Sequence, residues 1–326
     1  MARWYRIAWT GLWLAAACAA GCGDDDGASD VIDAPGEDAS AEDAPGELPS
    51  DVLDDDAAVP DVPGDVPADP GDAPEDRPEA DDAADAPDAP PGIWRPAPGT
   101  SWQWQLTGTI DASLDVEMYD IDLFEAPQAT IDGLRARGVA VICYFSAGSR
   151  EEWRDDADDF PPAAVGEPLD GWPGESWIDV RSTDVRRIMR ARLDLAVAKR
   201  CDGVEPDNVD AYANDSGFPL TAAHQLDYNR FLAAEAHARG LSVGLKNDLE
   251  QVDELLADFD WALDEECFEW DECELLEPFI GAGKAVFQVE YGAAALADSV
   301  CPRANALDFD TLIKNLDLDA WRVPCR

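Results

Sequence analysis

Residues 116–145 read VEMYDIDLFEAPQATIDGLRARGVAVICYF, and this stretch decides the fold. It begins with a strand candidate, Val116–Ile121, followed by Ala129–Arg137, where apolar and charged residues alternate at helical period. Gly138 is typical of a helix C-terminus, and a second strand candidate, Val139–Phe145, comes directly after it. A strand, a helix and a strand in this order are typical of a parallel sheet wrapped by helices.

The same alternation continues through the rest of residues 92–326. Strand candidates are Trp102–Leu106, Val116–Ile121, Val139–Phe145, Trp177–Val180, Asp202–Pro206, Leu241–Leu245, Trp261–Leu263 and Ala285–Val289. Further helices are predicted at Thr183–Lys199, Thr221–Arg239, Leu249–Ala257 and Glu274–Ala282, with Gly240 and Gly283 as additional helix stops. Eight strands within 235 residues predict the α/β class, as a single (β/α)8 TIM-like barrel. The sequence contains no GxGxxG or Walker signature.

The N-terminal residues to Cys22 have the features of a bacterial export signal. Two arginines precede an apolar run, Ile7–Ala20, which is shorter than the roughly 20 residues of a membrane span. Ala19-Ala20-Gly21-Cys22 resembles a lipobox, so we expect cleavage before Cys22 and lipidation of its thiol; Cys18 is a weaker alternative. The expected product is a cell-envelope lipoprotein, with the outer membrane favoured by Gly23, and an ordinary secreted protein is the alternative.

Residues 23–91 differ from the rest in composition. They contain 25 acidic residues against the single base Arg77, no aromatic residue and many prolines. Such a segment cannot build a core and its like charges repel, so we expect an extended disordered linker between anchor and domain. A calcium-binding role is less favoured, because a flexible chain loses much entropy in forming a defined coordination shell.

The folded part is also acidic. This linker holds about half of the formal net charge of −48, and residues 92–326 carry 46 acids and 20 bases, a net charge of −26. Nucleic acid binding requires clustered lysine and arginine, so a nucleic-acid partner is not expected. The charge favours a cationic or neutral ligand.

Six cysteines follow the signal: Cys143, Cys201, Cys267, Cys273, Cys301 and Cys325. An even number in an exported protein predicts three disulfides, and six cysteines allow 15 pairings. Cys267 with Cys273 and Cys301 with Cys325 are close in sequence, which would leave Cys143 for Cys201. A zinc site is less favoured, because paired C-x2-C motifs are missing and both histidines lie in one predicted helix. We expect no metal and no cofactor.

Active sites of such barrels lie at the C-terminal ends of the strands. Those ends read MYDIDLF (118–124), CYFSAGS (143–149), DGVEPDNVD (202–210), GLKND (244–248), LDEECFE (263–269) and QVEYG (288–292). Glu205 and Asp207 project to the same side of one strand, because side chains alternate with period two, and Pro206 stiffens the turn that follows. Glycoside hydrolysis needs two carboxyl groups in unlike environments, and Asp207 and Glu265 come from different strands that could face each other.

The other polar and aromatic residues at these ends are substrate-binding candidates. They are Tyr119, Asp120, Asp122, Tyr144, Ser146, Glu205, Asn208, Asp210, Tyr212, Lys246, Asn247, Glu290 and Tyr291, with Trp270 as a further aromatic. The aromatic rings could stack on sugars or pack in the core. Lys246 and Asn247 could bind hydroxyls, lower the pKa of a neighbouring carboxyl, or form a buried structural ion pair. A serine hydrolase is not expected, because Ser146 lacks a nucleophile-elbow pattern and neither histidine ends a strand.

Through DGVEPDNVD, CYFSAGS, the Lys-Asn pair, EECFEW and the closing LDAW, the sequence resembles glycoside hydrolase family 114, the endo-α-1,4-polygalactosaminidases. The resemblance covers about residues 94–326 and implies a (β/α)8 barrel with Asp207 and Glu265 as the catalytic pair. The family's wording before the cysteine is closer to Asn-Glu-Gln-Cys, whereas this chain has Asp264-Glu265-Glu266-Cys267, which leaves Glu265 and Glu266 as alternatives. The implied substrate is a partly deacetylated, cationic galactosaminogalactan.

By comparison with other barrel glycosidases, we expect Asp207 to be the nucleophile and Glu265 the acid/base of a retaining mechanism. The long loop Arg150–Ser176 is expected to determine sugar specificity, and the protein is expected to be a monomer. Two alternatives remain: an α-glycosidase of another sugar specificity, and a surface carbohydrate-binding barrel without turnover.

Overall fold

The computed structural model describes residues 92–326. The predicted signal peptide, the lipidation of Cys22 and the predicted linker, residues 23–91, lie outside the described residues. Among the helices that the structure describes, none combines the length and the apolar character needed to cross a bilayer.

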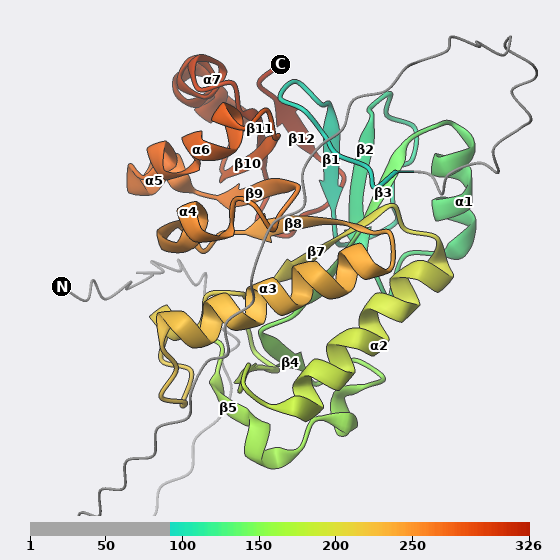
Figure 1. Cartoon of the computed structure of the whole chain (residues 1–326). Coiled ribbons are helices and arrows are strands. Elements are labelled where there is room, and N and C mark those ends of the chain that lie inside the picture. Colours follow the sequence, from blue (N-terminus) through green and yellow to red (C-terminus); the bar gives the residue numbers. More distant parts are fainter. Residues whose placement is uncertain (1–91) are drawn as a thin grey trace, which may run out of the picture. The chain divides into compact units, whose positions relative to one another are not determined.

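Eight parallel strands form a nearly closed barrel (Figure 1). In spatial order they are β1 (Trp102–Gln105), β2 (Met118–Asp122), β3 (Ala140–Ser146), β7 (Gly203–Asp207), β8 (Ser242–Lys246), β9 (Trp261–Glu265), β10 (Val286–Tyr291) and β11 (Asp310–Lys314). A short strand, β12 (Arg322–Pro324), pairs antiparallel with β11. Towards β1, the loop after β11 approaches closely enough for Leu106 N–H to donate to Leu318 O over 2.9 Å. The predicted (β/α)8 barrel is confirmed.

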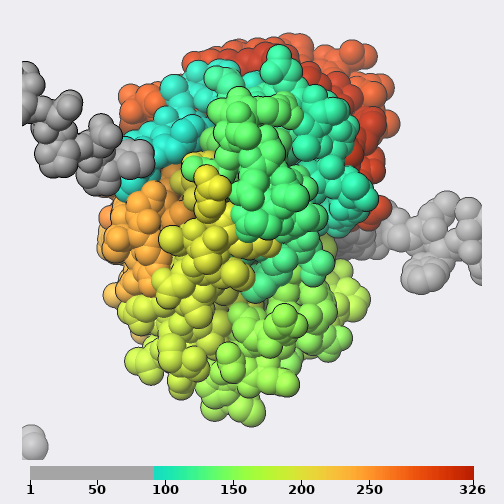
Figure 2. Space-filling model, turned by 90° about the vertical axis from the view of Figure 1, so that its right-hand side faces the viewer, coloured from blue at the N-terminus to red at the C-terminus, as the bar shows by residue number. Residues whose placement is uncertain are grey.

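Helices surround this sheet (Figure 1). They are α1 (Gln128–Ala136), α2 (Thr183–Lys199), α3 (Ala222–Ala238), α4 (Val252–Leu255), α5 (Cys267–Trp270), α6 (Glu277–Gly281) and α7 (Ala297–Ala306). Single 3-10 turns are η1 (Ala157–Asp159), η2 (Pro162–Ala164), η3 (Ala211–Ala213), η4 (Leu249–Gln251), η5 (Cys273–Leu276) and η6 (Ala294–Leu296). The two long helices start at side-chain caps: Ser182 accepts from Val185 N–H, and Thr221 forms a capping box with His224. Figure 2 shows the face on which α1 lies, with C-terminal residues in red along its upper edge.

Three glycines predicted as helix stops are confirmed. Gly138, Gly240 and Gly283 follow α1, α3 and α6 with φ of 80°, 75° and 72°, the left-handed conformation that ends a helix. The predicted helix 249–257 is divided into η4 and α4, and the predicted helix 274–282 into η5 and α6.

One strand prediction was wrong. Trp177–Val180 was expected in the barrel, but β6 (Glu175–Ile178) lies in a separate antiparallel sheet between β4 (Ser149–Glu151) and β5 (Val165–Pro168). The eighth barrel strand is β11, which was not among the candidates. A four-residue strand candidate carries no information about its partner strand, so periodicity could not assign β6 to a sheet.

Two apolar layers hold the barrel together. Alternate residues of each strand point to the axis, and at the N-terminal end the interior is filled by Trp102, Trp261 and Phe287, with the Phe287 ring centroid 4.8 Å from Trp102 and 5.5 Å from Trp261. On each strand, the residues that alternate with the inward-pointing ones pack outward against the helices. Because aromatic rings fill that end, the polar interior residues gather at the other end.

The six cysteines of residues 92–326 form disulfides, as predicted. The pairs are Cys143–Cys201, Cys267–Cys273 and Cys301–Cys325, and the first joins β3 to the residue two positions before β7 across 58 residues of sequence.

We expect the double substitution Cys143→Ala and Cys201→Ala to destabilise the fold. Opening a long covalent loop costs about 2–5 kcal/mol, which corresponds to a fall in Tm of roughly 5–15 °C for a domain of this size. Calorimetry of the variant measures it, with Cys267→Ala and Cys273→Ala as the control, because that loop spans only six residues. An equal fall in both variants would contradict the loop-length argument.

Candidate active site

Lys246, at the end of β8, lies at the centre of a group of carboxylates. Its Nζ lies 3.2 Å from Glu205 Oε1, 3.0 Å from Asp207 Oδ1 and 2.9 Å from Glu265 Oε2. Glu205 and Asp207 project from β7, as the period of two predicts, and Glu265 projects from β9. Three adjacent strands therefore bring their polar interior residues to one ammonium group.

This geometry limits the distance between the two predicted reacting groups. Asp207 Oδ1 and Glu265 Oε2 both lie within 3.0 Å of the same nitrogen, so they are at most about 6 Å apart. The side chains of Asp207 and Glu265 are 17% and 25% exposed, whereas those of Glu205 and Lys246 are sealed. In this arrangement the carboxyl groups of Asp207 and Glu265 are accessible to a ligand, and the Lys246 ammonium group is buried behind them.

Two tyrosines complete the contacts of this pair. Tyr144, on β3, donates from its hydroxyl to Asp207 Oδ2 over 3.1 Å, and Tyr291, on β10, donates to Glu265 Oε1. Burial and the neighbouring carboxylates raise the pKa of both phenols well above the ordinary value, so both remain donors at neutral pH.

Beneath Lys246, Glu205 contacts a further buried acid and a tryptophan. Trp104, on β1, donates from Nε1 to Glu205 Oε2 over 3.1 Å, and Lys246 Nζ lies 4.9 Å from the centroid of its ring. Asp120, on β2, is fully buried and in side-chain contact with Glu205. Burial raises the pKa of Asp120 well above its usual range and that of Glu205 to about 7.

The chain leaves the barrel abruptly after each of these strands. Asn208, Asn247 and Glu266 follow Asp207, Lys246 and Glu265 with φ of 60°, 48° and 65°, a conformation that L-residues other than asparagine and aspartate rarely adopt. Asn247 Oδ1 then accepts from Glu265 N–H over 3.1 Å, and Asn208 Nδ2 donates to Ser146 Oγ over 2.9 Å. The two asparagines thus bind neighbouring strand ends together.

The CYFSAGS segment (143–149) holds the backbone of Asp207. The N–H groups of Ala147 and Gly148 both donate to Asp207 O, over 2.8 and 3.0 Å. A Cβ on Gly148 would lie 1.6 Å from Asn208 O, so only glycine permits this approach. Ser146, a predicted substrate contact, is buried and bonds to Ser149 and Asn208.

Three predicted site residues have other partners. Tyr119 and Glu290 point away from the barrel axis: Tyr119 O–H donates to Asp111 O over 2.8 Å, and Glu290 Oε1 accepts from Phe268 N–H over 2.9 Å. Asp122 forms an ion pair with Arg154 at 2.6 Å. Since neighbours on a strand face opposite sides, Tyr119 cannot accompany Asp120, nor Glu290 accompany Tyr291.

Asp210 and Tyr212 lie beside Asp207 in the loop after β7. Burial and the charge of Asp207 raise the pKa of Asp210 to about 6. Tyr212 contacts Asp248, a residue that was not predicted, and burial together with Asp210 raises the pKa of Asp248 to about 9. Near neutral pH, Asp210 is therefore mostly ionised, whereas Asp248 is mostly protonated.

Aromatic residues outside the predicted set also belong to this end of the barrel. Trp104 was assigned only to a strand, although its place in the period of two could have revealed its inward direction. Trp153 and Trp172, in the loop 150–176, are 53% and 49% exposed, and Trp270, which was predicted, is 45% exposed. Exposed tryptophans of this kind favour contact with sugar rings.

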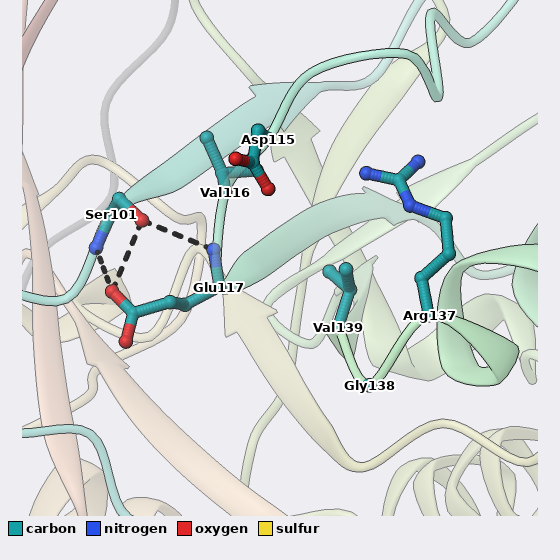
Figure 3. Close-up of a pocket in the computed structure, with 7 residues that line it drawn as sticks. All are labelled: Ser101, Asp115, Val116, Glu117, Arg137, Gly138 and Val139. Atoms are coloured by element: carbon teal, nitrogen blue, oxygen red, sulfur yellow. Dashed lines mark hydrogen bonds between the residues drawn. The ribbon is translucent and has the colours of Figure 1, made fainter.

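A pocket of about 350 Å³ lies at the opposite end of the barrel (Figure 3). Two of its charged residues are already engaged: Glu117 accepts from Ser101 N–H and Oγ, and Arg137 donates to two carbonyl oxygens of the loop before β2. This pocket lies between the turns at the N-terminal ends of the strands, and we assign no function to it. Within residues 92–326, no group of three or more histidine, cysteine, aspartate or glutamate side chains is arranged to hold a metal ion.

Comparisons with known proteins show the family and the fold of this chain. Residues 83–326 match the model of glycoside-hydrolase family GH114. This chain is 43% identical in sequence to Aspergillus fumigatus Ega3, whose crystal structure was solved in complex with galactosamine. The two structures superpose with a TM-score of 0.70 over 73% of this chain and 100% of that chain. The glycoside hydrolase domain of PelA from Pseudomonas aeruginosa, 13% identical with a TM-score of 0.57 over 68% and 97%, shares the fold. No curated protein sequence matches significantly.

Proposed function

The chain belongs to glycoside hydrolase family GH114, and we propose that it cleaves α-1,4-linked galactosamine in a partly deacetylated polysaccharide by a retaining mechanism. The observation that carries this proposal is the pair Asp207 and Glu265, held about 6 Å apart or less by Lys246. Retaining enzymes hold their carboxyl groups about 5–5.5 Å apart, whereas inverting enzymes need about 6.5–9.5 Å for a water molecule.

In the first step Asp207 attacks the anomeric carbon, and the bond to the leaving oxygen breaks as Glu265 transfers its proton to that oxygen. Tyr144 and Lys246 orient the Asp207 carboxylate by binding one oxygen each. The products of this step are the shortened polymer with a free hydroxyl and a glycosyl ester on Asp207.

In the second step the ionised Glu265 takes a proton from water, and the resulting hydroxide attacks the anomeric carbon and releases Asp207. Tyr291 donates to Glu265 Oε1 and Lys246 contacts Oε2, so both oxygens are held while the group alternates between acid and base. Two inversions at the same carbon retain the α configuration.

The proposed substrate carries ammonium groups, and two observations support it. Ega3, the 43% identical relative, was solved with galactosamine. The carboxylates of Asp207 and Glu265 lie at the strand ends that would receive the sugar, Asp210 lies in the loop after β7, and their potential favours a cation. We further propose that the protein is exported and lipid-anchored through Cys22, with residues 23–91 as the spacer.

Incubation of the purified protein with partly deacetylated galactosaminogalactan tests the proposal. We expect new reducing ends, and proton NMR of the first product should show the α anomer. Fully acetylated polymer and an α-1,4-glucan serve as controls. Binding without release of reducing ends would indicate a carbohydrate-binding protein. Equal cleavage of the glucan would indicate an α-glycosidase of another sugar specificity. A β anomer as the first product would indicate an inverting mechanism.

We expect Trp172→Ala and Trp153→Ala each to raise KM for the long polymer by about 2- to 10-fold, because one stacked ring contributes about 0.5–1.5 kcal/mol. Val197→Ala, which removes an exposed apolar side chain on α2, is the control and should leave KM unchanged. Initial rates over a range of polymer concentrations measure the effect. Unchanged KM in both tryptophan variants would exclude these rings from substrate binding.

A further inference from the structure

The Asp120 carboxyl group is buried and receives no hydrogen bond from the described residues. Its side chain is fully buried, and among the described residues no N–H or O–H group donates to either of its oxygens. An ionised carboxylate in such a place loses its hydration and gains no hydrogen bond, which costs several kcal/mol. The neutral acid does not carry this penalty, but its O–H needs an acceptor.

Glu205 is the acceptor within reach. The two side chains are in contact, and a carboxyl and a carboxylate can share a hydrogen bond only when one of them keeps a proton. Glu205 is the better anion, since it accepts from Trp104 Nε1 over 3.1 Å and its Oε1 lies 3.2 Å from Lys246 Nζ. The proton therefore belongs on Asp120.

We propose that Asp120 is a positioning residue, kept as a neutral acid that donates to Glu205, and that this acid–carboxylate pair fixes Lys246 between Asp207 and Glu265. The inference rests on the proposed function, because Asp207 and Glu265 are its reacting groups. Asp120 touches neither of them; it acts through Glu205 and the ammonium group.

The pair contributes one buried negative charge instead of two. Lys246 then faces Glu205, Asp207 and Glu265, and a fourth charge at Asp120 would draw the ammonium group downward, away from the reacting pair. The groups that face the pair are Tyr144 on β3, Asp207 on β7, Lys246 on β8 and Glu265 on β9, with the uncharged Trp104 on β1.

Asp120→Asn tests the proposal, because an amide N–H can donate to Glu205 as the neutral acid does. We expect kcat to fall by less than about threefold in Asp120→Asn and by more than about tenfold in Asp120→Ala, which offers no donor. Asp310→Asn is the matched control, since it removes another buried carboxyl group at the N-terminal end of β11. A fall in Asp120→Asn as large as in Asp120→Ala would overturn the proposal, as would wild-type kcat in Asp120→Ala.

Stability against pH supplies a second readout. Because the pKa of Asp120 is raised, its contribution to stability is complete below the ordinary aspartate value of 3.8 and is lost as the pH rises through the folded value. An amide does not titrate, so the Tm of Asp120→Asn should rise relative to the wild type as the pH increases from about 4 to 9. A constant difference in Tm would overturn the assignment of the proton.

Infrared spectroscopy detects the proton without any enzyme assay. At neutral pH, the difference spectrum of the wild type minus Asp120→Asn should contain the carbonyl band of a protonated carboxylic acid. If the wild type does not cleave the polymer but shows this band, the proposed function fails and the protonated pair stands. If the band is missing, or if Asp120→Asn does not fold although an amide replaces a neutral acid, the inference fails.

Discussion

Asp207→Asn is expected to lower kcat at least about 10³-fold on every substrate, because an amide cannot form the glycosyl ester, whereas Glu265→Gln should lose as much only on the polysaccharide. An aryl glycoside with a good leaving group needs no protonation. The first step in Glu265→Gln should therefore be nearly normal on that substrate, which gives a burst of released phenol followed by slow turnover. Stopped-flow kinetics of both variants on both substrates measures these differences.

Glu266→Gln is the control for that experiment. Glu266 is the neighbouring carboxyl group and lies after the end of β9 in a left-handed turn, with φ of 65°. Its N–H donates to Val289 O, while Lys246 contacts Glu265. We expect kcat of Glu266→Gln to change by less than about threefold. A loss as large as that of Glu265→Gln would reopen the choice between the two residues.

The parts of the site that could be predicted follow from the ends of the strands. Asp207, Lys246 and Glu265 are the last residues of β7, β8 and β9, and the C-terminal ends of parallel strands meet at one end of a barrel. The period of two also places Glu205 beside Asp207. These arguments need no knowledge of packing, which is why they hold for a single sequence.

What failed was the direction of individual side chains. Tyr119 and Asp120 are neighbours on β2, and so are Glu290 and Tyr291 on β10, yet both members of each pair were predicted to line the site. The alternation permits only one of each, and the barrel interior contains Asp120 and Tyr291. Strict use of the pleat would have kept only one member of each pair, although the apolar face does not say which, because it points outward on β2 and inward on β10.

Other features depend on contacts between distant segments. β6 resembles a barrel strand in sequence, but it pairs with β4 and β5 of the loop sheet. The alternatives for Lys246, a hydroxyl ligand or a buried ion pair, could not be separated, because the contact with Glu205, Asp207 and Glu265 depends on the tilt of three strands. The inward direction of Trp104 follows from the period of two, but its contacts with Glu205 and Lys246 depend on strands far away in the sequence.

Lys246→Met is expected to have the largest combined effect on activity and stability. It leaves Glu205, Asp207 and Glu265 without the ammonium group that lies within 3.2 Å of each of them. Removing one partner of a buried ion pair costs about 3–5 kcal/mol, so Tm should fall by roughly 6–20 °C, and kcat should fall at least about 10²-fold as the carboxylates separate. Calorimetry and initial rates measure the two effects, and Lys284→Met, which removes a half-buried ammonium outside the site, is the control.

The pH dependence separates this electrostatic account from a simple packing defect. As the pH falls, Glu205 becomes neutral and no longer needs a cation, so the difference in Tm between Lys246→Met and the wild type should shrink as the pH falls from about 8 to 5. The raised pKa of Glu205, about 7, places part of this change near neutrality, because the loss of Lys246 raises that pKa further. A difference in Tm that is constant across this range would mean that Lys246 acts through its aliphatic chain. In that case Lys246→Arg, which keeps the charge in a planar group of another shape, should be no more stable than Lys246→Met.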